Sequence, residues 1–353
     1  MFRKPALLNR KFFLPSLQAP PLSLTRIALQ IHFYMPENCL PPAEERAAWM
    51  SGTPTRLEQS GKAASVQCWI YLTYARLRNS GLPVQLVHQF PSRGIVVALT
   101  GNIPPGYQVP EEIFLVGVVA DGVPHPSAHF HVLQNAAHAN RLPNSCYLPH
   151  WPQPGLIPRD PDRGDRFENL VFFGDPRNLA PELHDPDFAS RIRERFGIEF
   201  RTAESDRWHD YSEVDAVLAI RAFGSKSFLS KPASKLYNAW QAEAPFLGGA
   251  DSAFSSHGCP GLNYLRCTSL GEVEAALSKL RNDIAFRRRM VREGRLATEA
   301  FLPGKVFERW AAFLAETAGR TAPAFFTKGR ASRKVYEFSQ RAILAADRLR
   351  GGY

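Results

Sequence analysis

Lys231 and Lys235 stand in the segment KPASKLYNAWQAEAPFLGG, residues 231–249, whose residue types and spacing suit the binding of an anion. The Lys-Pro pair opens a predicted helix, because proline is favoured in the first helical turn. The helix ends before Pro245, and a short buried strand then leads into a glycine turn at residues 248–249. Free N–H groups and the dipole at a helix N-terminus attract phosphate, and glycine lets a ligand approach the backbone.

The local pattern of this segment predicts how the helix is held. Leu236, Ala239 and Trp240 fall on one apolar face at helical spacing. Ser230 or Ser234 is expected to cap the first N–H groups with a side-chain oxygen. The two lysines would then project at the start of a helix whose other face is buried.

The same segment, followed by Asp251-Ser252-Ala253-Phe254, resembles the donor-binding half of GT-B-type glycosyltransferases. The likeness runs from about residue 168 to about residue 310 in the order of strands and helices, and it is similar to the retaining members of that group. It implies two Rossmann-like domains facing each other across a cleft, with C-terminal helices. It also implies a hexosyltransferase-like enzyme that moves a sugar from a nucleotide-sugar donor to an unknown acceptor, lipid-linked or polysaccharide.

Six residues are the candidates for donor binding. Cations and backbone N–H groups can hold a diphosphate without a metal, and Gly174 lies where the first strand of the second domain ends. Asp251 is similar in place to a donor-sugar glutamate of retaining enzymes, but the second glutamate of that pair has no counterpart near Tyr237, where Asn238 is the substitute. The donor candidates are Gly174, Arg177, Lys231, Lys235, Asn238 and Asp251.

The first domain offers candidates for the acceptor side. Asp121 and His125 follow the apolar run at residues 113–120, and loops at such strand ends line the crevice of a doubly wound sheet. A carboxylate or imidazole there could take a proton from an acceptor hydroxyl. A simple Asp-Gly turn is the alternative interpretation. At the domain junction, the residues expected to line a pocket are His150, Trp151 and Gln153.

No cofactor or metal is expected. The fingerprints GxGxxG and GxxxxGK[ST] are both absent, which disfavours a dehydrogenase or a P-loop ATPase. His125, His129, His131 and His138 have a spacing that suits metal ligation, but no Cys or Glu completes a first set of ligands. Hydrogen-bonded core histidines are the favoured interpretation.

Length and periodicity predict an α/β protein of two domains, because 353 residues exceed one typical core. A Pro-rich stretch without periodicity separates two series of strands and helices. We expect a flexible arm at residues 1–24, an acceptor domain at 25–150, a linker at 151–165, a donor domain at 166–320 and a basic amphipathic helix at 321–353.

The basic excess is a C-terminal feature. Residues 287–353 hold 15 Lys and Arg but 6 Asp and Glu, whereas the whole chain has a net charge of +10. Such a patch favours an anionic membrane surface, and a solvated helical face is the alternative. No nucleic-acid module is recognisable. The five scattered cysteines and the lack of a long apolar run indicate a cytoplasmic protein, peripheral on the inner face of a membrane if the basic helix binds lipid.

Two other functions stay open from the sequence. The missing glutamate pair motivates a non-catalytic nucleotide-sugar-binding or scaffold protein on the same fold. A nucleotide-sugar epimerase is the third hypothesis, since one scaffold serves many chemistries.

Overall fold

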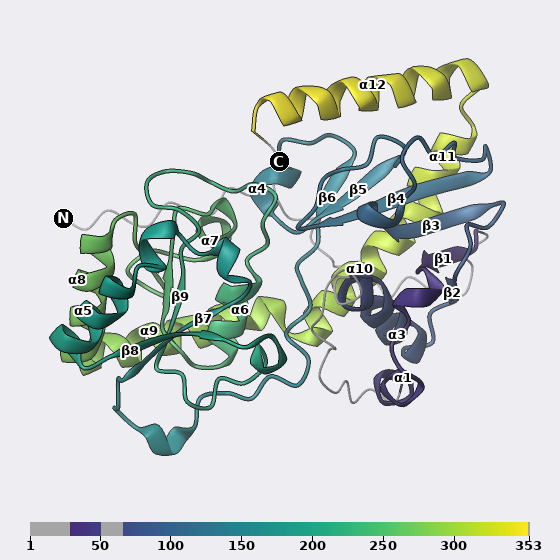
Figure 1. Ribbon diagram of the computed structural model, residues 1–353. Coiled ribbons are helices and arrows are strands. Elements are labelled where there is room, and N and C mark those ends of the chain that lie inside the picture. Colours follow the sequence, from purple (N-terminus) through teal and green to yellow (C-terminus); the bar gives the residue numbers. More distant parts are fainter. Residues whose placement is uncertain (1–28, 51–65, 352–353) are drawn as a thin grey trace, which may run out of the picture.

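The computed structural model describes residues 29–50 and 66–351, which form two domains built around one parallel sheet each (Figure 1). The expected arm at residues 1–24 lies outside the described residues. Both sheets carry helices on their two faces. The prediction of an α/β protein with Rossmann-like domains is confirmed.

The first sheet has six parallel strands in the order β2-β1-β3-β4-β5-β6. Every residue of β4 is buried, as expected for a central strand of a parallel sheet covered on both faces. The strands are β1 (Ile31–Tyr34), β2 (Val84–Val87), β3 (Gly94–Leu99), β4 (Ile113–Ala120), β5 (Phe130–Leu133) and β6 (Ser145–Tyr147).

The second sheet has five parallel strands in the order β11-β10-β9-β7-β8. Successive strands are added on one side of β7 for β8 and on the other side for β9, so the space between β7 and β9 is the switch point where ligands bind in doubly wound sheets. The strands are β7 (Asn169–Phe173), β8 (Glu199–Ala203), β9 (Ala216–Ala219), β10 (Phe246–Gly248) and β11 (Leu265–Arg266).

Helices cover both faces of each sheet. In the first domain they are α1 (Ala43–Met50), a π-helical turn (Gln67–Tyr71) continued by α3 (Leu72–Asn79), and α4 (Ala136–Ala139). In the second domain they are α5 (Pro186–Phe196), α6 (Ser234–Gln241), α7 (Ser252–His257), α8 (Leu270–Asn282) and α9 (Ile284–Thr298). Helices α6 and α9 pack closely, because a Cβ at Gly294 would meet the Trp240 ring at 2.5 Å.

The chain then returns to the first domain through α10 (Pro303–Glu316) and α11 (Ala322–Phe326) (Figure 1). Val306, Trp310 and Phe313 of α10 belong to the same buried core as strands β1, β3 and β4. The domain limits expected from the sequence stay predictions, but α10, inside the expected range 166–320, shares the core of the first domain. A helix that starts beside one domain and packs into the other ties the two together.

The last helix, α12 (Arg330–Leu349), lies over the opposite face of the first sheet from α3 and α10 (Figure 1). Leu344 packs with Val119 and Leu133 there. Among residues 29–50 and 66–351, no helix combines the length and apolar character needed to cross a bilayer.

One local expectation is wrong. Helix α6 has Ala233 at its N-cap and receives no side-chain capping hydrogen bond, so neither Ser230 nor Ser234 caps it. The first N–H groups of α6 are therefore left without the expected side-chain acceptor.

The crossing of α10 predicts that Trp310→Ala destabilises the first domain. The Trp310 indole is fully buried, with ring centroids 6.3 Å from Phe33 and 6.0 Å from Phe313. We expect a loss of about 3–5 kcal/mol in the free energy of unfolding, measured by urea denaturation and circular dichroism. Phe338→Ala on α12, where the side chain is 74% exposed, is the control and should change it by under about 0.5 kcal/mol. Equal effects of the two substitutions would contradict this packing.

Candidate functional site

The candidate site lies where the carboxyl ends of the strands of the two sheets meet. Gly174 follows β7, Arg221 comes shortly after β9, and Asp251 follows β10, so the second domain supplies residues from its switch point. Asp121 follows β4 of the first domain. We call these residues, with Lys231 and Lys235, the interdomain site.

Lys235 lies in the first turn of α6 and packs against the end of β7. Its ammonium lies 5.6 Å from the centre of the Phe172 ring, and a Cβ at Gly174 would come within 3.2 Å of Nζ. Gly174 has φ +150°, so this position is suited to glycine in both conformation and space. Lys235 forms no ion pair with any residue of the described ranges.

The surroundings of Lys235 lower its pKa from 10.5 to about 7. The largest cause is desolvation by burial, and the nearby Arg221 guanidinium lowers the pKa further. The Asp251 carboxylate opposes these effects but does not cancel them. The ammonium group is thus held in a place where an anion would stabilise its charged form.

Arg221 and Asp251 form a buried ion pair beside Lys235. Nε of Arg221 lies 3.0 Å from Oδ1 of Asp251, and the side chains are 9% and 1% exposed. Burial raises the pKa of Asp251, and Arg221 and Lys235 pull it back down. Neither carboxylate oxygen of Asp251 accepts a hydrogen bond of good geometry from the described residues, so both retain acceptor capacity.

Lys231 and Asp121 face each other from the two domains. Nζ of Lys231 lies 3.8 Å from Oδ2 of Asp121, whose side chain is 57% exposed. The distance is long for a hydrogen-bonded pair. The contact therefore leaves both groups able to bind other partners.

Asn135, at the end of β5, connects the first domain to the loop that carries Lys231. Its Nδ2 donates to the carbonyl of Lys231 at 3.1 Å and to Oγ of Ser252 at 2.9 Å. Its Oδ1 accepts from the N–H of Ala137 at 3.0 Å and so caps α4. One buried amide thus holds the loop that carries Lys231 against the first domain.

Two strained residues flank this contact. Ala120, directly before Asp121, has φ +55°, and Phe228, three residues before Lys231, has φ +47°. Such values are unfavourable for residues with a Cβ and persist only where the surrounding structure holds them. The strain on both sides of the site is consistent with a functional constraint there.

A second contact between the domains is aromatic. The hydroxyl groups of Tyr147 on β6 and Tyr237 on α6 are 2.9 Å apart. Phe301 stacks on Tyr237 with centroids 3.8 Å apart, and the His257 ring stacks on Tyr147 at 5.0 Å. These rings fix α6, and hence Lys235, relative to the first domain.

The structure brings together five of the residues that the sequence singled out: Asp121, Gly174, Lys231, Lys235 and Asp251. Arg177 is not among them, because its side chain is 89% exposed and pairs with its neighbour Asp175. Asn238 is buried on α6 and hydrogen-bonds to Tyr211. The expectation that Arg177 and Asn238 contact the donor stays a prediction.

The junction residues lie mostly inside the first domain. Trp151 is fully buried and donates through Nε1 to Oγ1 of Thr73 at 2.8 Å, so it does not line an open pocket. Nε2 of His150 lies 3.1 Å from the Cys68 sulfur, and burial lowers the pKa of His150. Gln153 is half-buried, and its Nε2 has no hydrogen-bond partner among the described residues.

The histidines of the first domain are held by hydrogen bonds. Nδ1 of His125 accepts from the N–H of Ser127 at 3.1 Å, and His131 contacts the His125 carbonyl. Nδ1 of His129 accepts from the N–H of Leu115 at 3.0 Å. His138 bonds to Asp347 at 2.7 Å. His125 thus has a structural partner, and no contact joins it to Asp121.

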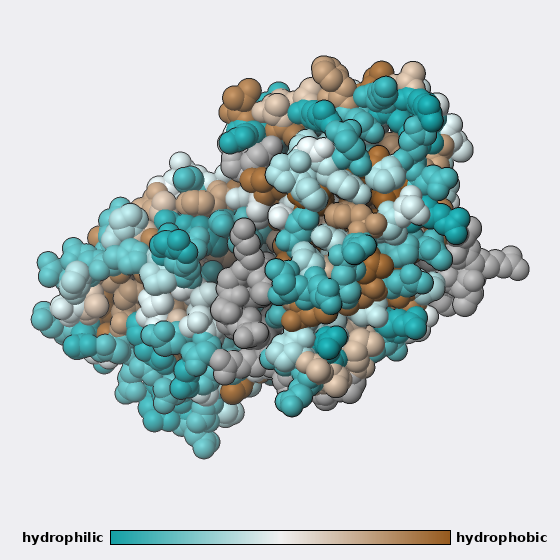
Figure 2. All heavy atoms as spheres, turned by 45° about the vertical axis from the view of Figure 1, so that its right-hand side comes forward, coloured by the Kyte–Doolittle hydropathy of each residue, from teal (hydrophilic) through white to brown (hydrophobic). Residues whose placement is uncertain are grey.

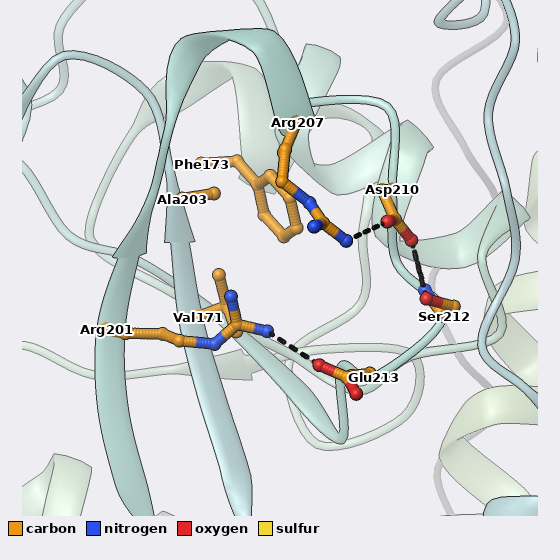
Figure 3. A pocket seen from close by; sticks show the side chains of 8 residues that line it. All are labelled: Val171, Phe173, Arg201, Ala203, Arg207, Asp210, Ser212 and Glu213. Atoms are coloured by element: carbon orange, nitrogen blue, oxygen red, sulfur yellow. Dashed lines mark hydrogen bonds and ion pairs between the residues drawn. The ribbon is translucent and has the colours of Figure 1, made fainter.

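A small pocket lined by residues of β7, of β8 and of the segment between β8 and β9 does not offer a comparable site (Figure 3). Its charges are satisfied internally, because Arg207 pairs with Asp210 and Arg201 lies 3.8 Å from Glu213. The residues that line it are Val171, Phe173, Arg201, Ala203, Arg207, Asp210, Ser212 and Glu213. Without an unpaired charge it gives no reason for an anion to bind.

Arg221 of the interdomain site and Asn135 beside it were not singled out from the sequence. Arg221 ends the run AVLAIR, and a cation at the carboxyl end of an apolar strand is a signal that could have found it. Asn135 follows β5 and caps α4, which a strand followed by Asn also suggests. Its bonds to the second domain are set by tertiary packing alone.

Comparison with solved structures shows a similar fold. Sucrose-phosphate synthase from Thermosynechococcus elongatus matches with a TM-score of 0.51 and 9% identity, over 82% of this chain and 99% of that chain. AviGT4, a glycosyltransferase involved in avilamycin A biosynthesis, matches with a TM-score of 0.49 and 14% identity, over 83% and 98% of the two chains. HepE from Anabaena in complex with UDP-glucose matches with a TM-score of 0.48 and 12% identity, over 82% and 100%.

No family model and no curated protein sequence matches this chain. At such low identity the likeness to sucrose-phosphate synthase establishes the fold alone. The resemblance carried by residues 231–249 and 251–254 predicted two facing Rossmann-like domains of the GT-B architecture, and this prediction is confirmed.

The bridge at Asn135 predicts that Asn135→Ala loosens the loop at residues 228–231. The substitution leaves the Lys231 carbonyl without this donor, which should cost about 1–3 kcal/mol of unfolding free energy. Hydrogen exchange of the backbone amides in this loop should become faster. Asn135→Asp keeps an acceptor for the α4 cap but cannot donate, so it should loosen the loop equally. Asn140→Ala, at an exposed position next to α4, is the control, and unchanged exchange in both Asn135 variants would disprove the bridge.

Proposed function

We propose that this protein is a glycosyltransferase that moves a sugar from a nucleoside-diphosphate sugar to an acceptor hydroxyl. The observation that carries the proposal is the Lys235 ammonium, which is half-buried at the uncapped N-terminus of α6 without an anionic partner in the described ranges. A diphosphate supplies the charge that this arrangement lacks.

The electrostatics of the interdomain site favour a dianion. Arg221 is largely balanced by Asp251, and Lys231 is held loosely by Asp121, so Lys235 contributes an unbalanced positive charge. The open N–H groups of α6 add the positive end of a helix dipole. The absence of a side chain at Gly174 leaves room for the end of the Lys235 side chain beside the carboxyl end of β7. The diphosphate would lie against α6, with Lys235 and Lys231 as its cations.

The shared fold supports this reading. Sucrose-phosphate synthase, whose name describes the making of a sugar phosphate, has the same two-domain architecture. Because one fold hosts many functions, this support is weaker than that from the site itself. The switch point of the second sheet, where Gly174 and Arg221 lie, is where such folds bind ligands.

The other residues of the site have distinct roles in the proposed reaction. The acceptor oxygen bonds to the anomeric carbon, the bond from that carbon to the diphosphate oxygen breaks, and the nucleoside diphosphate leaves. In an inverting transfer, Asp121 of the first domain accepts the proton of the acceptor hydroxyl. Asp251 can accept hydrogen bonds from hydroxyls of the donor. The developing charge on the leaving diphosphate is stabilised by Lys231 and Lys235.

A nucleotide-sugar-binding protein without catalysis is the second candidate. It is favoured by the lack of a counterpart to the glutamate pair of retaining glycosyltransferases. The two candidates share the diphosphate site and differ in whether the sugar is transferred. No observation supports an epimerase, and we do not propose one.

The proposal predicts that Lys235→Met weakens the binding of a nucleoside diphosphate. Losing a charge-assisted hydrogen bond costs about 1.5–3 kcal/mol, or about tenfold to a hundredfold in Kd. Calorimetric titration with UDP, GDP and ADP measures it. Lys279→Met removes an exposed lysine of α8 and is the matched control, expected to leave Kd unchanged.

Transfer separates the two candidate functions in the same preparation. With water as the stand-in acceptor, hydrolysis of the nucleotide-sugar that binds gives free sugar and nucleoside diphosphate. Such release, greatly reduced by Lys235→Met and slowed by Asp121→Asn with little change in Kd, supports a transferase. Binding without any release supports the non-catalytic protein. If none of the nucleotides binds the wild-type protein, the diphosphate site is disproved.

The lowered pKa of Lys235 predicts pH-dependent binding. With a pKa of about 7, Lys235 loses its charge as the pH rises through neutrality, whereas a bound dianion favours the charged form. The affinity should thus be highest below pH 7 and fall above it, by at most about tenfold per pH unit. Calorimetry in buffers of different ionisation enthalpy should detect proton uptake on binding between pH 7 and 8.

Lys235→Arg provides the control for this titration, because a guanidinium stays charged throughout the range. That variant should lose the proton uptake and the pH dependence attributed to Lys235. Proton uptake that persists unchanged in Lys235→Arg would assign the titration to another group.

A further inference from the structure

Helix α12 presents its apolar stripe to the solvent instead of to the protein. Val335 is 65% exposed, Phe338 74% and Leu349 90%, and Ala342 and Ala345 between them are also exposed. These five residues recur at steps of three and four, so they form one continuous face, which we call the outer stripe. Figure 2 shows brown and tan side chains along the top of the molecule, over α12.

The face of α12 that contacts the protein is more polar than the outer stripe. The Tyr336 hydroxyl donates to the carbonyl of His129 at 2.6 Å, and Asp347 bonds to His138 at 2.7 Å with both side chains buried. Gln340 is buried between them along the helix, and the apolar contacts of this face come from Leu344, Ile343 and the Tyr336 ring. Rotation of the helix to bury the outer stripe would break these polar contacts, so the exposure of the stripe is fixed by specific bonds.

A row of cations borders the outer stripe on one side. Lys334, Arg341 and Arg348 are spaced by seven residues and thus lie on one side of the helix, and all three are exposed. None of them forms an ion pair with a described residue. The two acidic residues of the helix are Glu337, which is half-buried, and Asp347, which is buried, so no carboxylate is fully exposed beside the stripe. The outward side of α12 is therefore apolar and basic.

We propose that α12 docks this protein on an anionic lipid surface. Phe338, Val335 and Leu349 enter the boundary between headgroups and acyl chains, and the cation row contacts the lipid phosphates. A second copy of the chain fits this face less well, because it would bring two sets of unpaired cations together around the apolar contact. In this proposal α12 lies along the lipid surface. No helix of the described residues has the length and apolar character needed to cross a bilayer.

A series of hydrogen bonds runs from α12 to the loop that carries Lys231. Asp347 near the end of α12 holds His138 of α4, and α4 is capped by Asn135, which bonds to the Lys231 carbonyl. The C-terminal end of α12 is therefore linked to the loop that carries Lys231 through His138 and Asn135 of the first domain. The proposal of docking does not depend on the transfer reaction, because vesicle binding and nucleotide binding are measured separately.

Co-sedimentation of the full chain with phosphatidylcholine vesicles, with and without phosphatidylglycerol, tests the proposal. We expect binding that requires phosphatidylglycerol and weakens at high salt. The triple variant Val335→Ser, Phe338→Ser, Leu349→Ser should reduce the bound fraction to background. Leu296→Ser, at an exposed leucine of α9, should not reduce it.

The cation row is tested with a second pair of variants of equal net charge. Lys334→Gln, Arg341→Gln and Arg348→Gln together should weaken partitioning by about a hundredfold, from about 1 kcal/mol for each cation near the surface. Arg78→Gln, Arg93→Gln and Arg266→Gln remove three exposed cations elsewhere and should have a much smaller effect. Circular dichroism confirms that each variant is folded.

Three outcomes would overturn the proposal. Equal losses in the two charge variants would show that net charge, and not this surface, drives binding. No sedimentation of the wild-type protein with anionic vesicles would exclude the lipid surface. A dimer that Phe338→Ser converts to a monomer, without vesicle binding, would assign the outer stripe to a second copy.

Discussion

The Lys235 ammonium is the group around which the interdomain site is organised. Desolvation makes its charge costly, and that cost is visible in a pKa lowered to about 7. A lysine in an exposed helix would avoid this cost by reaching into water. Here the Phe172 ring and the bare backbone of Gly174 hold the side chain at the end of β7. A folded protein that keeps an unsatisfied cation in such a place gains affinity for an anion at the expense of stability.

Two contacts between the domains hold the residues of the interdomain site in place. The Asn135 amide joins the first domain to the carbonyl of Lys231, and the Tyr147 and Tyr237 hydroxyls join β6 to α6. Both contacts involve residues of the first domain near strand ends, opposite the cations of the second domain. The crossing helix α10 adds a covalent and apolar connection between the domains. The relative position of Asp121 and Lys231 thus follows from several independent bonds.

The sequence predicted most elements of this fold because the signals were local. The apolar run of β4 and the strand, helix and glycine turn of residues 231–249 are continuous patterns with one structural solution each. Lys231, Lys235 and Asp251 could be grouped from the sequence because they belong to one local pattern of helix, strand and glycine turn, and their role in binding stays a prediction. The site was not predictable where long-range packing decides. Trp151 donates a hydrogen bond to Thr73 in the core, and Arg177 forms an ion pair with its neighbour Asp175.

The spacing of the apolar residues of α12 does not determine which face of the helix is buried. The periodicity of Val335, Phe338 and Leu349 identifies an amphipathic helix, but it does not say which face the protein covers. In most surface helices the apolar face is the buried one. In α12 the buried Asp347–His138 pair and the Tyr336 hydroxyl reverse that orientation, because moving these groups away from their partners would leave polar atoms buried without bonds. The polar contacts therefore determine the exposed surface, and the apolar residues are free for a partner outside the chain.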